Sequence, residues 1–307
     1  MSSAIAPARA DTRSEWLLRL PRYAGRATLY AAAVVGALLF MGPFFFAISS
    51  SLKTAAEIHQ FPPLVWPARP AFENYIRLFQ MDGVYFARWY LNSLFITCAA
   101  VVGTVVSSCA AAYGFSRFRW RLREFFFIVL LSTLVLPEEV VIIPKFLMFH
   151  FVPLALFGHT WIDTWWPLIL PSWFGGGAFS VFLLRQFFLQ VPRDLDEAAV
   201  IDGASSWQIL WKILLPLAQP ALATVAIFSF LTHWNDFFHP LIYLSTVDSF
   251  PLSVGLRWFQ QYATDPSQPR DNLLMAASIL MVLPCVIIFF TMQRYFVRGI
   301  VMSGIKG

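Results

Sequence analysis

Long apolar stretches alternate with short polar segments along most of this chain. A helix that crosses the hydrocarbon of a membrane needs roughly 20 mainly apolar residues. Six stretches approach or exceed that length: Ala27–Ser49, Trp89–Tyr113, Phe125–Pro144, Trp165–Leu184, Leu217–Tyr243 and Leu273–Met292. Since a spanning segment must satisfy its own backbone hydrogen bonds, such runs predict helices. The pattern predicts an all-α membrane protein with six transmembrane helices.

Helix-breaking residues recur inside these stretches. The internal prolines are Pro43, Pro137, Pro167, Pro171, Pro240 and Pro284, and three consecutive glycines occupy 175–177. Each proline removes a backbone donor and can kink its helix, and the glycines permit close helix contact or a local break. Broken helices are typical of proteins that line a water-filled path, although such residues are also common in ordinary membrane helices.

Composition and charge agree with this class. The chain has 307 residues, of which 58% are hydrophobic and 13% charged, against about 25% charged in soluble domains. Of the 22 Lys and Arg residues, 15 fall in the N-terminal tail, the segments after the second and fourth stretches, and the C-terminal tail. Basic residues favour the cytoplasmic side, so both termini are expected there. The net charge of +5 then needs no nucleic-acid partner.

This topology divides the chain into a cytoplasmic tail (1–26), a transmembrane domain (27–298) and a second cytoplasmic tail (299–307). The first apolar stretch is longer than the apolar core of a signal peptide and lacks a clear cleavage pattern, so it is interpreted as a retained helix. The three cysteines, Cys98, Cys109 and Cys285, lie in apolar segments without metal-ligand spacing, and we interpret them as small buried hydrophobes.

A compact polar block, about 191–216, separates the fourth and fifth stretches. Asp194, with Glu197 three residues later, predicts an N-cap variant of the capping box. Gly203 suits a helix end, and Ser205 or Ser206 caps a second helix over 207–215, before Pro216 bends the chain into the fifth stretch. The block is therefore expected to form a helix, a glycine turn and a second helix on the cytoplasmic side. A helix lying on the membrane surface is the alternative. Such helices favour Lys and Arg on their polar face, whereas this block is acidic.

Four passages carry a family resemblance. They are Glu197-Ala198-Ala199 with Asp202-Gly203 and Ile213-Leu214-Leu215-Pro216; Trp234-Asn235-Asp236-Phe237; Phe72-Glu73-Asn74-Tyr75; and the C-terminal segment from Gln293. Together they resemble the permease subunits of bacterial carbohydrate ABC importers, and most of all those related to the second permease of the maltose system. The resemblance covers the chain after about residue 25, whereas the N-terminal tail matches no family pattern.

The resemblance implies a place in a larger machine. The expected partners are two ATP-binding subunits that carry ATP and Mg, a second permease, a periplasmic or lipid-anchored solute-binding protein, a sugar and the lipid of the bacterial inner (plasma) membrane. The expected coupling residues are Glu197, Ala198, Ala199, Asp202, Gly203, Ile213, Leu215 and Pro216. Through these residues the chain would dock an ATP-binding subunit, and closure of the ATP-binding subunits would be transmitted to the membrane helices.

Polar residues inside or beside the spans are candidates for the substrate path, because ionisable groups in a membrane are costly and are often functional. Trp234, Asn235 and Asp236 could offer a stacking face and hydrogen bonds to a sugar, or serve helix packing. Glu138 and Glu139 could line the path or reach headgroup water. His233 and His239 lack the spacing of a ligand pair, so a structural role is expected.

No catalytic or metal-binding residues are expected in this chain. Gly299 to Lys306 is a near miss for a phosphate-binding loop, because Lys does not directly follow the second Gly. Alternatives to sugar import are an ABC permease for a polyamine, phosphate ester or peptide, and a proton-coupled secondary transporter that uses Asp236 and the histidines.

Overall fold

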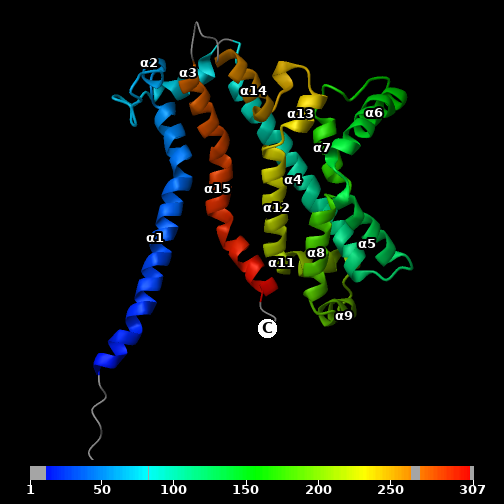
Figure 1. The fold of residues 1–307 in the computed structure, drawn as a ribbon. Coiled ribbons are helices and arrows are strands. Elements are labelled where there is room, and N and C mark those ends of the chain that lie inside the picture. The colour runs from blue at the N-terminus through cyan, green and yellow to red at the C-terminus, as the bar shows by residue number, and fades with distance from the viewer. Residues whose placement is uncertain (1–11, 82, 264–269, 305–307) are drawn as a thin grey trace, which may run out of the picture.

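The computed structural model describes residues 12–81, 83–263 and 270–304, and every regular element in that part of the chain is a helix (Figure 1). The long helices are α1 (Thr12–Ser51), α4 (Phe86–Arg117), α6 (Glu138–Phe157) and α15 (Asp271–Gly304). Shorter helices make up the rest: α2 (Ala55–Ile58), α3 (Glu73–Gln80), α5 (Arg123–Ser132), α7 (Trp166–Trp173), α8 (Ala178–Gln190), α9 (Asp194–Ile201), α10 (Ser206–Ile209), α11 (Leu215–Leu217), α12 (Gln219–Trp234), α13 (Phe238–Tyr243) and α14 (Leu252–Ala263). The all-α prediction is confirmed for the described residues.

Helix α4 is the centre of the bundle and packs against α7, α8 and α12. Figure 1 places α2, α3, α6, α13 and α14 at the upper end and α9 and α11 at the lower end. The start of α1 and the end of α15 also lie at the lower end. Helix α1 runs along the flank and packs mainly against α15.

Two apolar cores hold the bundle together. The upper core includes Trp89, Trp234 and Phe259, and the lower core includes Leu184 and Leu214. Each of these side chains is at most 1% exposed. Large apolar side chains on α1, α5 and α6 are instead exposed, as expected of helices that face lipid.

The described residues contain five helices long and apolar enough to cross a membrane, or six if the bent pair Ser206–Leu217 and Gln219–Trp234 is one span. The predicted bounds of the second and sixth stretches fall inside α4 and α15. The first stretch falls inside α1, but α1 already begins at Thr12, within the expected polar tail; residues 1–11 of that tail lie outside the described residues.

The expectation of one continuous third helix over 125–144 is wrong. Helix α5 ends at Ser132, a 3-10 turn follows, and Pro137 is the N-cap of α6, which continues to Phe157, beyond the predicted end at Pro144. Proline disfavours helical geometry in the residue before it and contributes no N–H. Two helices therefore replace one.

The fourth and fifth stretches are also interrupted. Gly175, Gly176 and Gly177 all have positive φ and separate α7 from α8, as the glycine run predicted. A Cβ on Gly176 would lie 2.5 Å from the carbonyl oxygen of Thr104, so close contact with α4 also requires glycine here. In the fifth stretch α12 ends at Trp234 and α13 starts at Phe238, because the ring of Pro240 is incompatible with a helical carbonyl four residues earlier.

Candidate coupling block and translocation path

The polar block between α8 and α12 folds as a helix, a glycine turn and a second helical segment. Helix α9 is followed by α10, one π-helical turn over Leu210–Leu214, and α11. The expected capping box at Asp194 is wrong: Arg193 is the N-cap, and no side chain caps α9. Three acids in the first turn of α9 still place negative charge at the positive end of the helix dipole.

The turn after α9 has the geometry that the sequence predicts. Gly203 has φ +81°, and the N–H of Ala204 donates to the carbonyl of Ala199 at 2.9 Å while that of Gly203 donates to Val200 at 3.0 Å. These two bonds form a Schellman motif, which needs a left-handed residue at the Gly203 position. Ser205 then caps α10 in a capping box with Gln208. Local sequence therefore fixes the angle between the two helices.

Four interactions hold this coupling block (residues 191–217) against the last turn of α4. The hydroxyl of Tyr113 donates to the carbonyl of Ser206 at 2.9 Å. Nε of Arg117 lies 2.9 Å from Oδ2 of Asp196, and its Nη2 donates to the carbonyl of Val191 at 3.1 Å. Arg193 donates to the carbonyl of Ser116 at 3.3 Å. The block is therefore attached to the lower end of α4.

The Arg117–Asp196 pair is buried but imperfectly matched. The two side chains are 6% and 18% exposed, and neither Nε of Arg117 nor Oδ1 of Asp196 has a hydrogen-bond partner among the described residues. Burial raises the pKa of the Asp196 carboxyl above its usual range, against the opposing charges of Arg117 and Arg193. The pair joins two segments at a desolvation cost.

The opposite surface of the block is exposed and mixes apolar and acidic groups. Ile201 is 85% and Val200 60% exposed, and Trp207 on α10 is 64% exposed. Of the predicted coupling residues, Glu197, Ala198, Asp202, Gly203 and Pro216 are exposed, Ile213 and Leu215 are half-buried, and Ala199 is buried against the lower core. Exposed apolar side chains in such a patch mark an interaction surface.

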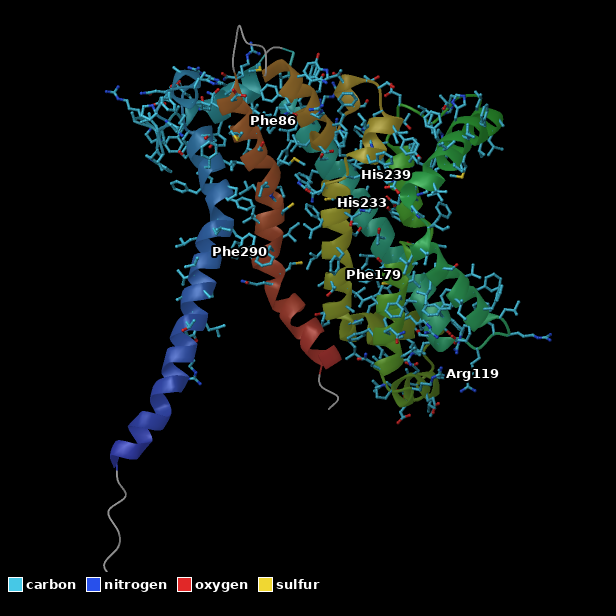
Figure 2. The ribbon with its side chains drawn as sticks, viewed as in Figure 1. Phe86, Arg119, Phe179, His233, His239 and Phe290 are labelled. Carbon is cyan, nitrogen blue, oxygen red and sulfur yellow. The ribbon has the colours of Figure 1, made fainter. Side chains whose placement is uncertain are left out.

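The break between α12 and α13 brings several polar groups together in the upper half of the bundle. Nδ1 of His239 lies 3.0 Å from Oδ2 of Asp236, and the backbone carbonyl of Asp236 accepts a bond from Ser253 at 2.6 Å. Asn235 is exposed and its side chain donates to the carbonyl of Leu231. Figure 2 shows His233 and His239 on either side of this break. Discontinuous helices of this kind form solute sites in transporters.

The other predicted path residues are placed differently. Trp234 is 1% exposed, its N–H donates to the carbonyl of Met281, and its ring stacks on Phe230. Its face is therefore not presented to a solute in this conformation. Glu138 is exposed at the start of α6, 3.7 Å from Nε2 of His239, and Glu139 is exposed beside it. Glu138 and Asp236 thus flank one histidine.

A buried polar seam between α4, α7 and α12 was not anticipated from the sequence. Ser229 donates to the hydroxyl of Thr104 at 3.2 Å, and Ser107 donates to the carbonyl of Ser172 at 2.9 Å. The ring nitrogens of His233 lie 3.0 Å from the Ser172 hydroxyl and 2.7 Å from the Ser229 carbonyl. His233 is therefore held by helix-packing contacts, and the spacing of Thr104 and Ser107 along one helix face was the available signal. No group of three metal-ligating side chains occurs among the described residues.

Comparison with known proteins identifies this architecture. Residues 103–302 match the family of binding-protein-dependent transport system inner membrane components. The chain is 34% identical over 241 residues to the arabinooligosaccharides transport system permease protein AraQ of Halalkalibacterium halodurans, covering 78% of this chain and 81% of that protein. It is 31% identical over 274 residues to the sn-glycerol-3-phosphate transport system permease protein UgpE of Yersinia pestis, covering 88% and 94%.

A solved structure has the same fold. A chain of a bacterial ABC transporter involved in the import of the acidic polysaccharide alginate superposes with a TM-score of 0.76 at 26% identity, covering 95% of this chain and 100% of that one. The fold and these matches define an ABC importer permease. The chain belongs to the binding-protein-dependent transport system inner membrane component family, which confirms the expected resemblance.

Proposed function

We propose that this chain is one of two permease subunits of a sugar-importing ABC transporter in the bacterial inner membrane. Two relatives support the cargo class, since one serves arabinooligosaccharide transport and one belongs to an alginate importer. The glycerol-phosphate relative keeps a phosphate ester as the second candidate. The charge distribution, together with the shared lower end of α1, α9 and α15 (Figure 1), supports six crossings with both ends in the cytoplasm.

The exposed face of the coupling block carries this proposal. A hydrophobic side chain such as Ile201, 85% exposed at the end of α9, is costly in water unless a partner covers it. The exposed acids Glu197 and Asp202 beside it suit a basic rim on that partner. We assign this face to an ATP-binding subunit, which would hold ATP and Mg and perform the hydrolysis. A second permease and a solute-binding protein complete the transporter.

Substitution at Ile201 tests the dock. Ile201→Asp places a charge in the proposed interface, and Val65→Asp is the matched control, since Val65 is 73% exposed at the opposite end of the molecule. Each tagged variant is co-expressed with the other subunits of the transporter and purified in mild detergent. We expect the ATP-binding subunit to be recovered with wild type and Val65→Asp and lost with Ile201→Asp.

Two results would contradict the proposal. Equal recovery of the ATP-binding subunit with Ile201→Asp would remove α9 from the dock. A chain that purifies alone and transports in proteoliposomes without ATP would instead be a secondary carrier. The Asp236–His239 pair is the feature that such a carrier would use, and membership of an ABC importer family argues against it.

The polar groups at the α12–α13 break are proposed to line the path of the solute. Asn235 and Asp236 lie on the interrupted segment, and Glu138 and Glu139 lie at the start of α6. Hydrogen-bonding side chains at a break can contact sugar hydroxyls without a binding cavity of their own. Because Trp234 is buried, it is assigned to helix packing and not to this path.

A further inference from the structure

A hollow lined by arginines lies where α4 turns into α5. It measures about 360 Å³ and is lined by Arg119, Trp120, Arg121, Arg123, Glu124, Phe125 and Arg193. Figure 2 shows Arg119 at the lower end of the molecule, where the coupling block also lies. The lining has four cationic side chains and one carboxylate. Arg193 also bonds the coupling block to α4, but the proposed docking face around Ile201 and the proposed solute path lie outside this hollow.

The negative charge of Glu124, the only acid in this lining, is already balanced by two arginines. Arg123 binds Oε1 of Glu124 through Nε at 2.9 Å and Nη2 at 2.7 Å. Arg185, which is mostly buried, donates to both carboxylate oxygens at 3.1 Å. The hydrogen bonds from Arg123, followed by the charge of Arg185, hold the pKa of Glu124 below its usual range. The carboxylate is therefore ionised and paired.

Arg119 and Arg121 are exposed and have no ion pair or hydrogen bond to any described residue. Arg193 uses one nitrogen on the carbonyl of Ser116 and lies near enough to Asp196 to affect its pKa. The hollow thus has unpaired guanidinium groups in excess over acid. Guanidinium groups present several N–H donors in a geometry that matches phosphate oxygens.

The surroundings of the hollow indicate which phosphate would occupy it. Trp120 is 42% exposed and its ring lies 5.7 Å from that of Phe126. Phe125 is 59% and Ile128 64% exposed, so an uncovered apolar face continues from the hollow along α5. Trp at the boundary between apolar and cationic side chains is typical of the membrane interface. Since this face of α5 faces lipid, a phospholipid can place its headgroup in the hollow and its acyl chains on the apolar face at the same time, which a soluble anion cannot do.

We propose that the Arg119–Arg121 hollow is a binding site for the phosphate of an anionic phospholipid headgroup, with the acyl chains on the exposed face of α5. The proposed topology places this site in the cytoplasmic leaflet, and to that extent the inference rests on the proposed function. The lipid would fix the α4–α5 hairpin, and so the lower end of α4, at the membrane surface. Basic pockets on this side of membrane proteins bind such headgroups.

Native mass spectrometry of the detergent-purified complex, titrated with phosphatidylglycerol or phosphatidylcholine, tests the site. The variant is Arg119→Gln with Arg121→Gln. The control, Arg69→Gln with Arg257→Gln, removes the same charge outside the hollow. At roughly fivefold in affinity per arginine, as for basic residues near an anionic surface, the variant should lose about 25-fold in phosphatidylglycerol binding. The control should keep the wild-type preference over phosphatidylcholine.

Three results would overturn the proposal. Unchanged phosphatidylglycerol binding in the variant would show that the hollow is not the site. Displacement of the lipid by millimolar inorganic phosphate, but not by chloride at equal ionic strength, would assign the hollow to a soluble anion. Loss of the ATP-binding subunit with lipid binding intact would make it a protein dock. Because lipid binding is measured without transport, its failure leaves the Ile201→Asp experiment unaffected.

Discussion

The buried Arg117–Asp196 pair allows a sharp test of how the coupling block is held. Asp196→Asn keeps the size of the side chain but removes its charge, which leaves Arg117 in place with a side chain only 6% exposed. Breaking a fully buried pair by removing one partner costs about 3–5 kcal/mol. Asp196 is 18% exposed, and Arg117 keeps its bond to the carbonyl of Val191. Burial also raises the pKa of the Asp196 carboxyl, so desolvation offsets much of the attraction to Arg117. We therefore expect a smaller loss, about 1 kcal/mol.

The assay compares unfolding midpoints and coupled activity in the purified complex. The matched control is Glu73→Gln, which breaks a Glu73–Arg77 pair whose side chains are 60% and 62% exposed and should cost under about 0.5 kcal/mol. With the anchor to α4 weakened, binding-protein-stimulated ATP hydrolysis should fall in Asp196→Asn. The ATP-binding subunit should still co-purify, because the exposed face with Ile201 is unchanged.

A double-mutant cycle with Arg117→Met decides whether the effect belongs to the pair. If the pair is the anchor, the double variant should be more stable than the sum of the single losses predicts. If Asp196→Asn and Glu73→Gln have the same stability and the same stimulated ATP hydrolysis, the reasoning is refuted. Additive losses in the cycle would show that the two side chains act independently.

Three further predictions concern the Gly203 turn, Asp163 in the loop between α6 and α7, and the proposed solute path. Gly203→Ala should lower the free energy of unfolding by about 1–2 kcal/mol, because an L-residue is strained at a φ of +81°, and since no atom lies within 4 Å of the added Cβ, no clash contributes. Gly203→Asn should cost less, and equal losses in the two variants would contradict this. Burial opposes ionisation of Asp163, but hydrogen bonds from Thr246 and Ser245 together lower its pKa below 3.8. The ionised carboxylate should therefore stabilise the fold fully above pH 3.8, and this stabilisation should be lost as the pH falls through the lowered pKa. An acid titration of the unfolding midpoint should show this dependence in wild type and not in Asp163→Asn. Asp236→Asn should raise the KM for transport of the cognate solute without loss of the ATP-binding subunit, and an unchanged KM would remove Asp236 from the path.

Local sequence was sufficient where short-range rules decide the structure. The Gly203 turn, the Ser205 cap and the glycine break at 175–177 each depend on the backbone freedom or capping chemistry of a few adjacent residues. The same reasoning failed at Asp194, because Arg193 took the N-cap position. One residue of register at a helix start is set by tertiary contacts, here the bond of Arg193 to the carbonyl of Ser116.

Contacts between distant segments could not be predicted from the pattern. Arg117 and Asp196 are far apart in the chain and meet only because α4 and α9 pack at one end of the bundle. The polar seam from Thr104 to His233 likewise requires α4, α7 and α12 to be side by side. The division of the third stretch at Pro137 was visible as a proline, but hydropathy alone did not distinguish a kink from two separate helices.

Helix α12 connects the two candidate regions mechanically. Its lower end follows an 81° bend from the coupling block, and its upper end is the break that carries Asn235 and Asp236. A helix of 16 residues is about 24 Å long at 1.5 Å per residue, and its backbone hydrogen bonds make it move as one piece. A tilt of about 10° at the bend would therefore shift the break by about 4 Å over that length. Since α4 is bonded to the same block and packs against α12, displacement of α9 by the proposed ATP-binding subunit would act on both helices. Asp196→Asn would weaken only the connection to α4.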